Sequence, residues 1–400
     1  MTRASTHLRV LVALLFILAL ASVWRQQPPL APKVANGDHG PSWLAVAEPD
    51  VDADSCVAHC MARNRRSADA LPANATCAAR DWWCSVNFTP DVLNDACAWI
   101  CRNQFPRNCT AARFLVMKKE WDWGLGSNWH IRIVLLVAAL SEARVFAYSD
   151  DDKSLWTHDG DADPDCARGK VDCYLLPITS CALPADWQSR AVRFGRRPRA
   201  EQFVYADSTY QVGRFSPKTR PQWPRPDALA ATLPMSFWNA QFAAFLYRPN
   251  QRVINDVLVP RALQAFGGRG PPARFLSVFV RGGDKGYEAA LRSPREYWAR
   301  AVELCDRFDI RDVYVSADSR LAMDEIATQL APARPDLRVH ALNASRLDHG
   351  LTMDVLRTSW RTPAIRALLD TALADLFISQ RAAVWLGTLS SNWCASPLGH

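Results

Sequence analysis

Residues 274–288 read Arg-Phe-Leu-Ser-Val-Phe-Val-Arg281-Gly-Gly-Asp284-Lys-Gly-Tyr-Glu288, an apolar run that passes directly into a polar, glycine-rich loop. Such a run is typical of a buried strand that ends in a tight turn. An amphipathic helix is expected next at 294–308, and another strand at 313–315. This order of elements predicts a doubly wound α/β unit with a parallel sheet, which we assign to residues 272–400.

A similar pattern lies earlier in the chain. An apolar run at 112–117 leads to the loop Gly124-Leu-Gly126, and a periodic apolar helix and a further strand are expected after it. We assign this unit to residues 111–265, in which 150–200 are expected to be mainly loops and 201–265 to be helical without a clear strand. The two units together predict two Rossmann-like domains that face a cleft.

The end of the chain also passes from a strand to a polar loop. Thr362-Pro363 is a helix start signal, and apolar residues recur at helical spacing as far as Phe377. A buried strand is expected at 383–386, and it leads into Thr388-Leu-Ser390-Ser391. The polar loops with the strongest signals therefore follow the ends of predicted strands, where doubly wound domains bind ligands.

Length and composition support two folded units. The chain has 400 residues, 49% of them hydrophobic and 22% charged, which is enough apolar material for real cores and excludes wholesale disorder. The net charge is 47 − 40 = +7, without a concentrated basic stripe. We therefore expect no nucleic-acid partner.

The first 50 residues predict entry into the secretory pathway. An uncharged apolar run at 10–24 lies between Arg9 and Arg25, so residues 1–25 are either a signal anchor or a cleaved signal peptide. Residues 26–50 are rich in proline and small residues and are typical of a stem. The expected location is the Golgi membrane, in type II orientation with a luminal catalytic domain, and a secreted protein is the alternative.

The cysteines form a separate pattern. Of the 12 cysteines, seven lie between Cys56 and Cys109 and three more between 166 and 181, which predicts disulfides in an oxidising compartment and a small Cys-rich helical unit at 51–110. Two pairs at i,i+4 spacing place their members on one helical face each, so two antiparallel helices can be cross-linked twice. Seven is odd, so one cysteine pairs outside this unit or stays free. The full connectivity stays open.

Four Asn-x-Ser/Thr triplets fit the same compartment. They begin at Asn74, Asn87, Asn108 and Asn343.

Arg281 and the glycines after it point to phosphate binding. A guanidinium binds phosphate oxygens through two parallel hydrogen bonds, and glycines let the backbone N–H groups approach closely. Asp284 is suited to orient Arg281 or Lys285, and Glu288 is suited to act as a base on a substrate hydroxyl. The alternative is that Arg281 and Asp284 form a structural ion pair.

The segment resembles the His-Val-Arg-Arg-x-Asp-Lys…Glu motif of the core α1,6-fucosyltransferases and, more loosely, of the protein O-fucosyltransferases. Three further stretches occur in the same order as in that group, at 124–130, 313–318 and 375–394. The resemblance implies a GT-B architecture and an inverting transferase that takes fucose from GDP-fucose. It also implies no cofactor, no metal requirement, and a glycan or glycoprotein acceptor.

The resemblance assigns roles residue by residue. Arg281 and Lys285 match residues at the donor phosphates, and Glu288 matches the proposed catalytic base. Asp375 matches a residue that binds guanine, and His130 a histidine of the first domain. The predicted substrate-binding residues are Gly124, Gly126, His130, Gly282, Gly283, Asp284, Asp318, Asp375, Ser390 and Ser391.

The chain departs from the family pattern at three positions. Phe279 stands where the family has a histidine, Gly282 replaces a second arginine, and Ser319 replaces a second acid. The family also extends further beyond the matched serines, so the second domain is expected to be truncated or degenerate. These departures favour two alternatives: an inactive luminal protein that binds glycans or nucleotides, or a transferase that uses another nucleotide sugar. A metal clamp at 150–152 is a further, weaker alternative.

Overall fold

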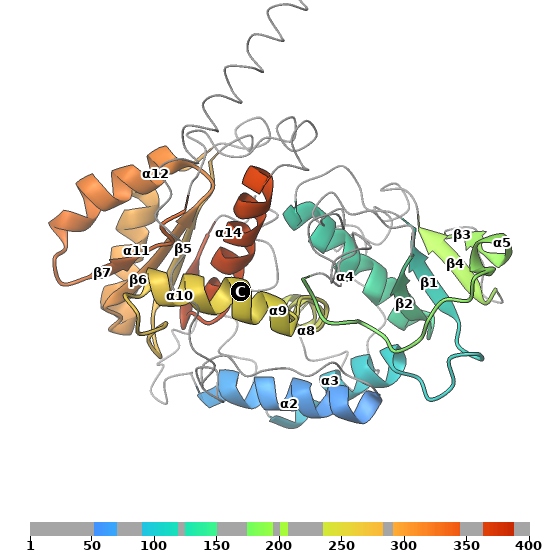
Figure 1. Ribbon diagram of the computed structural model, residues 1–400. Coiled ribbons are helices and arrows are strands. Elements are labelled where there is room, and N and C mark those ends of the chain that lie inside the picture. Colours follow the sequence, from blue (N-terminus) through green and yellow to red (C-terminus); the bar gives the residue numbers. More distant parts are fainter. Residues whose placement is uncertain are drawn as a thin grey trace, which may run out of the picture.

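The computed structural model describes residues 52–69, 90–118, 125–149, 174–194, 201–206, 235–282, 291–344 and 363–387. These residues form a mixed α/β protein with two parallel sheets, one in each half of the molecule (Figure 1). The predicted fold class is confirmed to that extent. The apolar run at 10–24 lies outside the described residues, and none of the described helices is long and apolar enough to cross a membrane.

The first sheet has the strand order β2-β1-β4-β3, and all its pairings are parallel. Helix α4 (Leu125–Ser141) connects β1 (Phe114–Met117) to β2 (Val145–Tyr148), as the sequence predicted. The expectation that 201–265 holds no strand was wrong, because β4 (Phe203–Ala206) lies between β1 and β3 (Val192–Arg193). Three of the four residues of β4 are buried, but the strand is not followed by a glycine-rich loop such as the one after β1.

The second sheet has the order β7-β6-β5-β8, again with parallel pairings throughout. Its strands are β5 (Leu276–Val280), β6 (Asp312–Ala317), β7 (Arg338–His340) and β8 (Val384–Leu386). The chain builds outward from β5 to β7 and then returns to the other side of β5. The strand order therefore reverses between β5 and β8, as in doubly wound domains.

Helices cover both faces of this sheet. Val278 and Val280 pack in one apolar cluster with residues of α11 (Pro294–Phe308), which begins with a capping box between Ser293 and Glu296. On the opposite face Ser277 donates a hydrogen bond to Ser379 of α14 (Pro363–Ser379), at 2.8 Å. The alternation of side chains along β5 thus separates an apolar face from a partly polar one.

A chain of helical segments joins the two halves. It consists of α8 (Met235–Leu246), α9 (Gln251–Val253), the π-helix η4 (Ile254–Leu258) and α10 (Val259–Ala265). In Figure 1 these segments run below α14 and α4, which lie between the two sheets. One apolar core cluster includes residues from α4, α8, α10 and α14 together with residues of both sheets.

Two π-helical turns occur where a proline interrupts a helix. In η4 the N–H of Val259 bonds to the carbonyl of Ile254, and Pro260 follows. The second, η6 (Ile326–Leu330), follows α12 (Arg320–Glu325) and leads into the short η7 (Ala331–Ala333), which contains Pro332. Proline has no N–H and crowds the preceding turn, so the helix widens before it.

The Cys-rich segment forms a helical hairpin, α2 (Ala53–Asp69) and α3 (Pro90–Gln104). Disulfides Cys56–Cys101 and Cys60–Cys97 cross-link the two helices, which confirms the predicted double linkage. Among the described cysteines of this unit, Cys109 pairs outside it, with Cys181, which precedes the short helix α5 (Trp187–Arg190). The hairpin also packs on the core, since the rings of Trp99 and Trp238 lie 5.6 Å apart.

Candidate functional site

Arg281 and Asp318 lie side by side at the carboxyl edge of the second sheet. Each is the first residue after its strand, and the last pair in the register of β5 and β6 is Val280 with Ala317. Side chains alternate along a strand, so Arg281 leaves the sheet on the face that Ser277 presents to α14. The strand ends therefore bring together two residues that are 37 positions apart in the sequence.

Asp318 binds both the side chain of Arg281 and the backbone after it. One carboxylate oxygen forms an ion pair with Nη1 of Arg281, and the other accepts a hydrogen bond from the N–H of Gly282 at 2.8 Å. The two side chains are 21% and 14% exposed, so solvent screens the pair only in part. Asp318 thus holds the guanidinium at the strand end, a positioning role that the sequence had suggested for Asp284.

Gly282 makes this close approach possible. A Cβ atom at this position would lie 3.3 Å from Oδ1 of Asp318 and 3.5 Å from Cβ of Ser319. A larger side chain would therefore press on the carboxylate that holds Arg281. This contact gives a physical reason for a glycine at a position where the fucosyltransferase motif has a second arginine.

The strand order places this pair at the point where doubly wound sheets bind ligands. The last register pair of β8 with β5 is Leu386 with Val278, so the chain leaves β8 beside the end of β5. The strand order reverses between these two strands, and ligands of such sheets bind outside the carboxyl ends at this reversal. Ser390 and Ser391 follow β8 in sequence but lie outside the described residues.

Asp375 belongs to a different set of contacts. Its side chain is buried, and its Oδ1 accepts a hydrogen bond from the hydroxyl of Tyr314 at 2.5 Å. Tyr314 lies four residues before Asp318, which is about 13 Å along a strand. The structure therefore places Asp375 against the middle of β6, whereas Arg281 pairs with Asp318 at the end of that strand.

In the first half of the molecule, two predicted residues lie at the start of α4. Gly126 is buried in its first turn, and His130 is half-buried one turn later. Lys118, which was not among the predicted residues, is exposed directly after β1, and its Nζ lies 5.1 Å from the ring centre of Tyr205. The only available signal was its place directly after a predicted strand.

The remaining predicted residues lie outside the described residues. They are Gly124, Gly283, Asp284, Lys285, Glu288, Ser390 and Ser391. Within the described ranges, no three His, Cys, Asp or Glu side chains are grouped closely enough to hold a metal ion.

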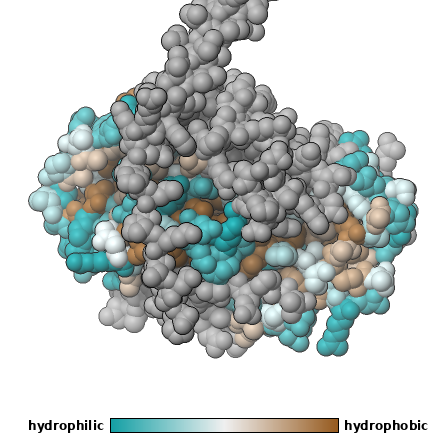
Figure 2. Space-filling model, in the orientation of Figure 1, coloured by the Kyte–Doolittle hydropathy of each residue, from teal (hydrophilic) through white to brown (hydrophobic). Residues whose placement is uncertain are grey.

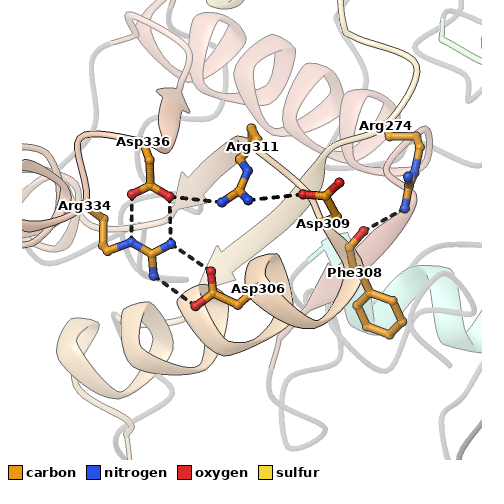
Figure 3. A network of polar contacts seen from close by, with 7 residues as sticks. All are labelled: Arg274, Asp306, Phe308, Asp309, Arg311, Arg334 and Asp336. Atoms are coloured by element: carbon orange, nitrogen blue, oxygen red, sulfur yellow. Dashed lines mark hydrogen bonds and ion pairs between the residues drawn. The ribbon is translucent and has the colours of Figure 1, made fainter.

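A network of charged residues lies at the opposite, amino edge of the second sheet (Figure 3). Arg334 binds Asp306 and Asp336, and Arg311 binds Asp336 and Asp309. Hydrogen bonds from Arg334 lower the pKa of Asp336 to about 2. Each charged group of this network has a partner of opposite charge, so we do not place the candidate site there.

The surface over α11 and α12 is mainly hydrophilic, as the left edge of Figure 2 shows. Pairs such as Arg292–Glu296 and Arg320–Asp324 lie there at i,i+4 spacing. We therefore regard this face as solvated and place the candidate site at the carboxyl edge of the sheet.

No protein-family model matches the chain, and no curated protein matches it. Among solved structures, the chain is similar to a mutant of Arabidopsis thaliana FUT1 in complex with GDP. The TM-score is 0.38 and the sequence identity 10%, over 84% of this chain and 76% of that one. Values this low do not establish a shared function.

Proposed function

We propose that this protein is a luminal glycosyltransferase that binds the diphosphate of a nucleotide sugar at the carboxyl edge of its second sheet. The supporting observation is the guanidinium of Arg281, which Asp318 holds beside the Gly282 amide at the reversal of strand order. A guanidinium and backbone N–H groups are the donors that bind phosphate oxygens. The specific proposal is an inverting transfer of fucose from GDP-fucose to a glycan or protein hydroxyl.

The proposed reaction needs no metal or other cofactor. Glu288 removes the proton of the acceptor hydroxyl while that oxygen attacks the anomeric carbon, on the side opposite the nucleotide. The bond between the anomeric carbon and the diphosphate oxygen breaks, and GDP leaves with the bonding electrons. Arg281 and Lys285 stabilise the negative charge that develops on the diphosphate.

We also propose where in the cell the protein lies. The N-terminal apolar run holds the protein in the Golgi membrane in type II orientation, and the stem separates the folded part from the bilayer. The three disulfides between described residues support an oxidising compartment.

A thermal-shift panel of GDP, UDP and ADP tests the donor class. At a ligand concentration 100 times Kd, binding adds about 2.7 kcal/mol to the free energy of unfolding. We expect GDP to stabilise the wild-type protein, and Arg281→Ala to abolish this effect. Arg300→Ala is the matched control, because Arg300 is an exposed arginine of α11 that pairs with Glu303 in the same helix. Equal stabilisation of wild type and Arg281→Ala by GDP would refute the proposed site.

One observation favours a second candidate, a luminal nucleotide- or glycan-binding protein without catalysis. Phe279 stands where the fucosyltransferase motif has a histidine, and its buried ring offers no hydrogen-bonding group to a nucleotide base. Slow release of GDP from GDP-fucose separates the two candidates. Hydrolysis that is lost in Glu288→Gln supports the transferase, and GDP binding without any hydrolysis or transfer supports the binding protein.

A further inference from the structure

The turn between α3 and β1 contains one of the Asn-x-Thr triplets, Asn108-Cys109-Thr110. Asn108 and Thr110 are both exposed, as an acceptor site for N-glycosylation requires. The middle residue is unusual, because Cys109 forms a disulfide with Cys181. Modification of Asn108 and closure of this disulfide therefore involve adjacent residues.

In the folded protein the triplet is closed on itself. Oδ1 of Asn108 accepts hydrogen bonds from the hydroxyl of Thr110 at 2.7 Å and from its backbone N–H at 3.0 Å. The N–H of Ala111 also reaches this oxygen, at 3.3 Å. The acceptor amide and the hydroxyl that marks the triplet thus bind each other, and an enzyme cannot bind both without opening the turn.

The surrounding chain holds the turn in this form. The carbonyl of Thr110 accepts a hydrogen bond from Nε2 of Gln202 at 2.9 Å, and the disulfide ties Cys109 to Cys181. Gln202 immediately precedes β4, and Cys181 lies between β2 and β3 in the sequence. Both restraints come from segments that are synthesised long after Asn108.

We propose that Asn108 is N-glycosylated only while Cys109 is still reduced, and that closure of Cys109–Cys181 ends its reactivity. In this step the amide nitrogen of Asn108 forms a bond to the anomeric carbon of an oligosaccharide carried on a lipid diphosphate. The bond from that carbon to the diphosphate oxygen breaks, the lipid diphosphate leaves, and the amide loses one proton. The inference depends on the luminal location proposed above and is independent of the transferase activity.

The spacing of the two cysteines sets the time available. Cys181 follows Cys109 by 72 residues, which at about 5–20 residues per second corresponds to about 4–14 s of synthesis. During this period Cys109 cannot form its native disulfide, and the triplet is accessible. After it, closure and modification compete, so we expect partial occupancy of Asn108 in the wild-type protein.

The test measures site occupancy in protein made by a secretory host. Glycans are released enzymatically in ¹⁸O-water, which marks each formerly modified asparagine, and peptides are quantified by mass spectrometry. We expect Cys181→Ser to raise the occupancy of Asn108 at least twofold, because Cys109 then stays free. Cys97→Ser is the matched control: it removes the Cys60–Cys97 disulfide and should leave Asn108 occupancy unchanged.

A second measurement does not depend on how well the variant folds. A reducing agent added during synthesis of the wild-type protein keeps Cys109 reduced and should raise Asn108 occupancy to the same extent. Equal occupancy with and without the disulfide would overturn the inference. So would an unmodified Asn108 in Cys181→Ser when Asn343, which is also exposed, carries a glycan. Absence of glycans from every triplet would instead refute the luminal location.

Discussion

A double-mutant cycle on Arg281 and Asp318 tests the arrangement on which the candidate site depends. The cycle compares Arg281→Ala, Asp318→Asn and the double variant with the wild type. An exposed ion pair contributes about 0.2–1 kcal/mol to the free energy of unfolding, and a hydrogen bond to a charged group about 1.5–3 kcal/mol. Since the two side chains are 21% and 14% exposed, the pair lies between these cases. We expect a coupling energy of about 1–1.5 kcal/mol.

Each single variant should lose more free energy of unfolding than the coupling energy alone. Arg281→Ala leaves a largely buried carboxylate with the Gly282 amide, and Asp318→Asn removes the counter-charge of the guanidinium. Urea unfolding followed by tryptophan fluorescence gives the four free energies, and the 16 tryptophans provide the signal.

The control cycle uses Arg320 and Asp324, an i,i+4 pair whose side chains are 50% and 55% exposed. Its coupling energy should be about 0.3–0.5 kcal/mol. A coupling energy for Arg281 and Asp318 no larger than that of this exposed pair would refute the proposal that Asp318 holds the guanidinium at the strand end.

Three further predictions concern other parts of the fold. Tyr314→Phe should lower the free energy of unfolding by about 1–3 kcal/mol, because the buried Asp375 carboxylate loses a donor; a urea midpoint equal to that of the wild type would contradict this. Arg334 lowers the pKa of Asp336 from 3.8 to about 2, so the stabilisation is present above pH 3.8 and is lost as the pH falls through about 2. Circular dichroism should therefore show acid unfolding that is less steep in this range for Asp336→Asn, and identical profiles would count against the network. Burial raises the pKa of the Cys305 thiol to about 11, so iodoacetamide should label Cys305 slowly at pH 8 until denaturant is added; rapid labelling of the folded protein would show an accessible thiolate.

The elements that were predicted from sequence are those with strong local signals. The apolar run before Arg281 and the capped helix α11 were recognised because their periodicity and their end signals agree. The hairpin of α2 and α3 followed from two cysteine pairs at helical spacing. In contrast, no glycine-rich loop or helix start signal directly adjoins β4, and β7 contains a single apolar residue, so neither strand has a clear local signal.

The candidate site was predictable only in part, for a related reason. Arg281 stood out through its position after a strand and before two glycines. Its partner Asp318 lies on another strand, and only the register of β5 with β6 brings the two together. The contact between Tyr314 and Asp375 spans 61 residues in the same way. Such pairings depend on tertiary structure, which a local sequence pattern does not encode.

The continuous apolar cluster has a consequence for how this molecule moves. Leu115 of the first sheet and Tyr314 of the second belong to the same cluster, bridged by side chains of α8 and α10. A wide swing of one half against the other would expose much of this shared interior to water, whereas small sliding of the helices over one another would not. Admission and release of a bound molecule should therefore proceed through sliding of this kind, and heating should melt both halves in one calorimetric peak.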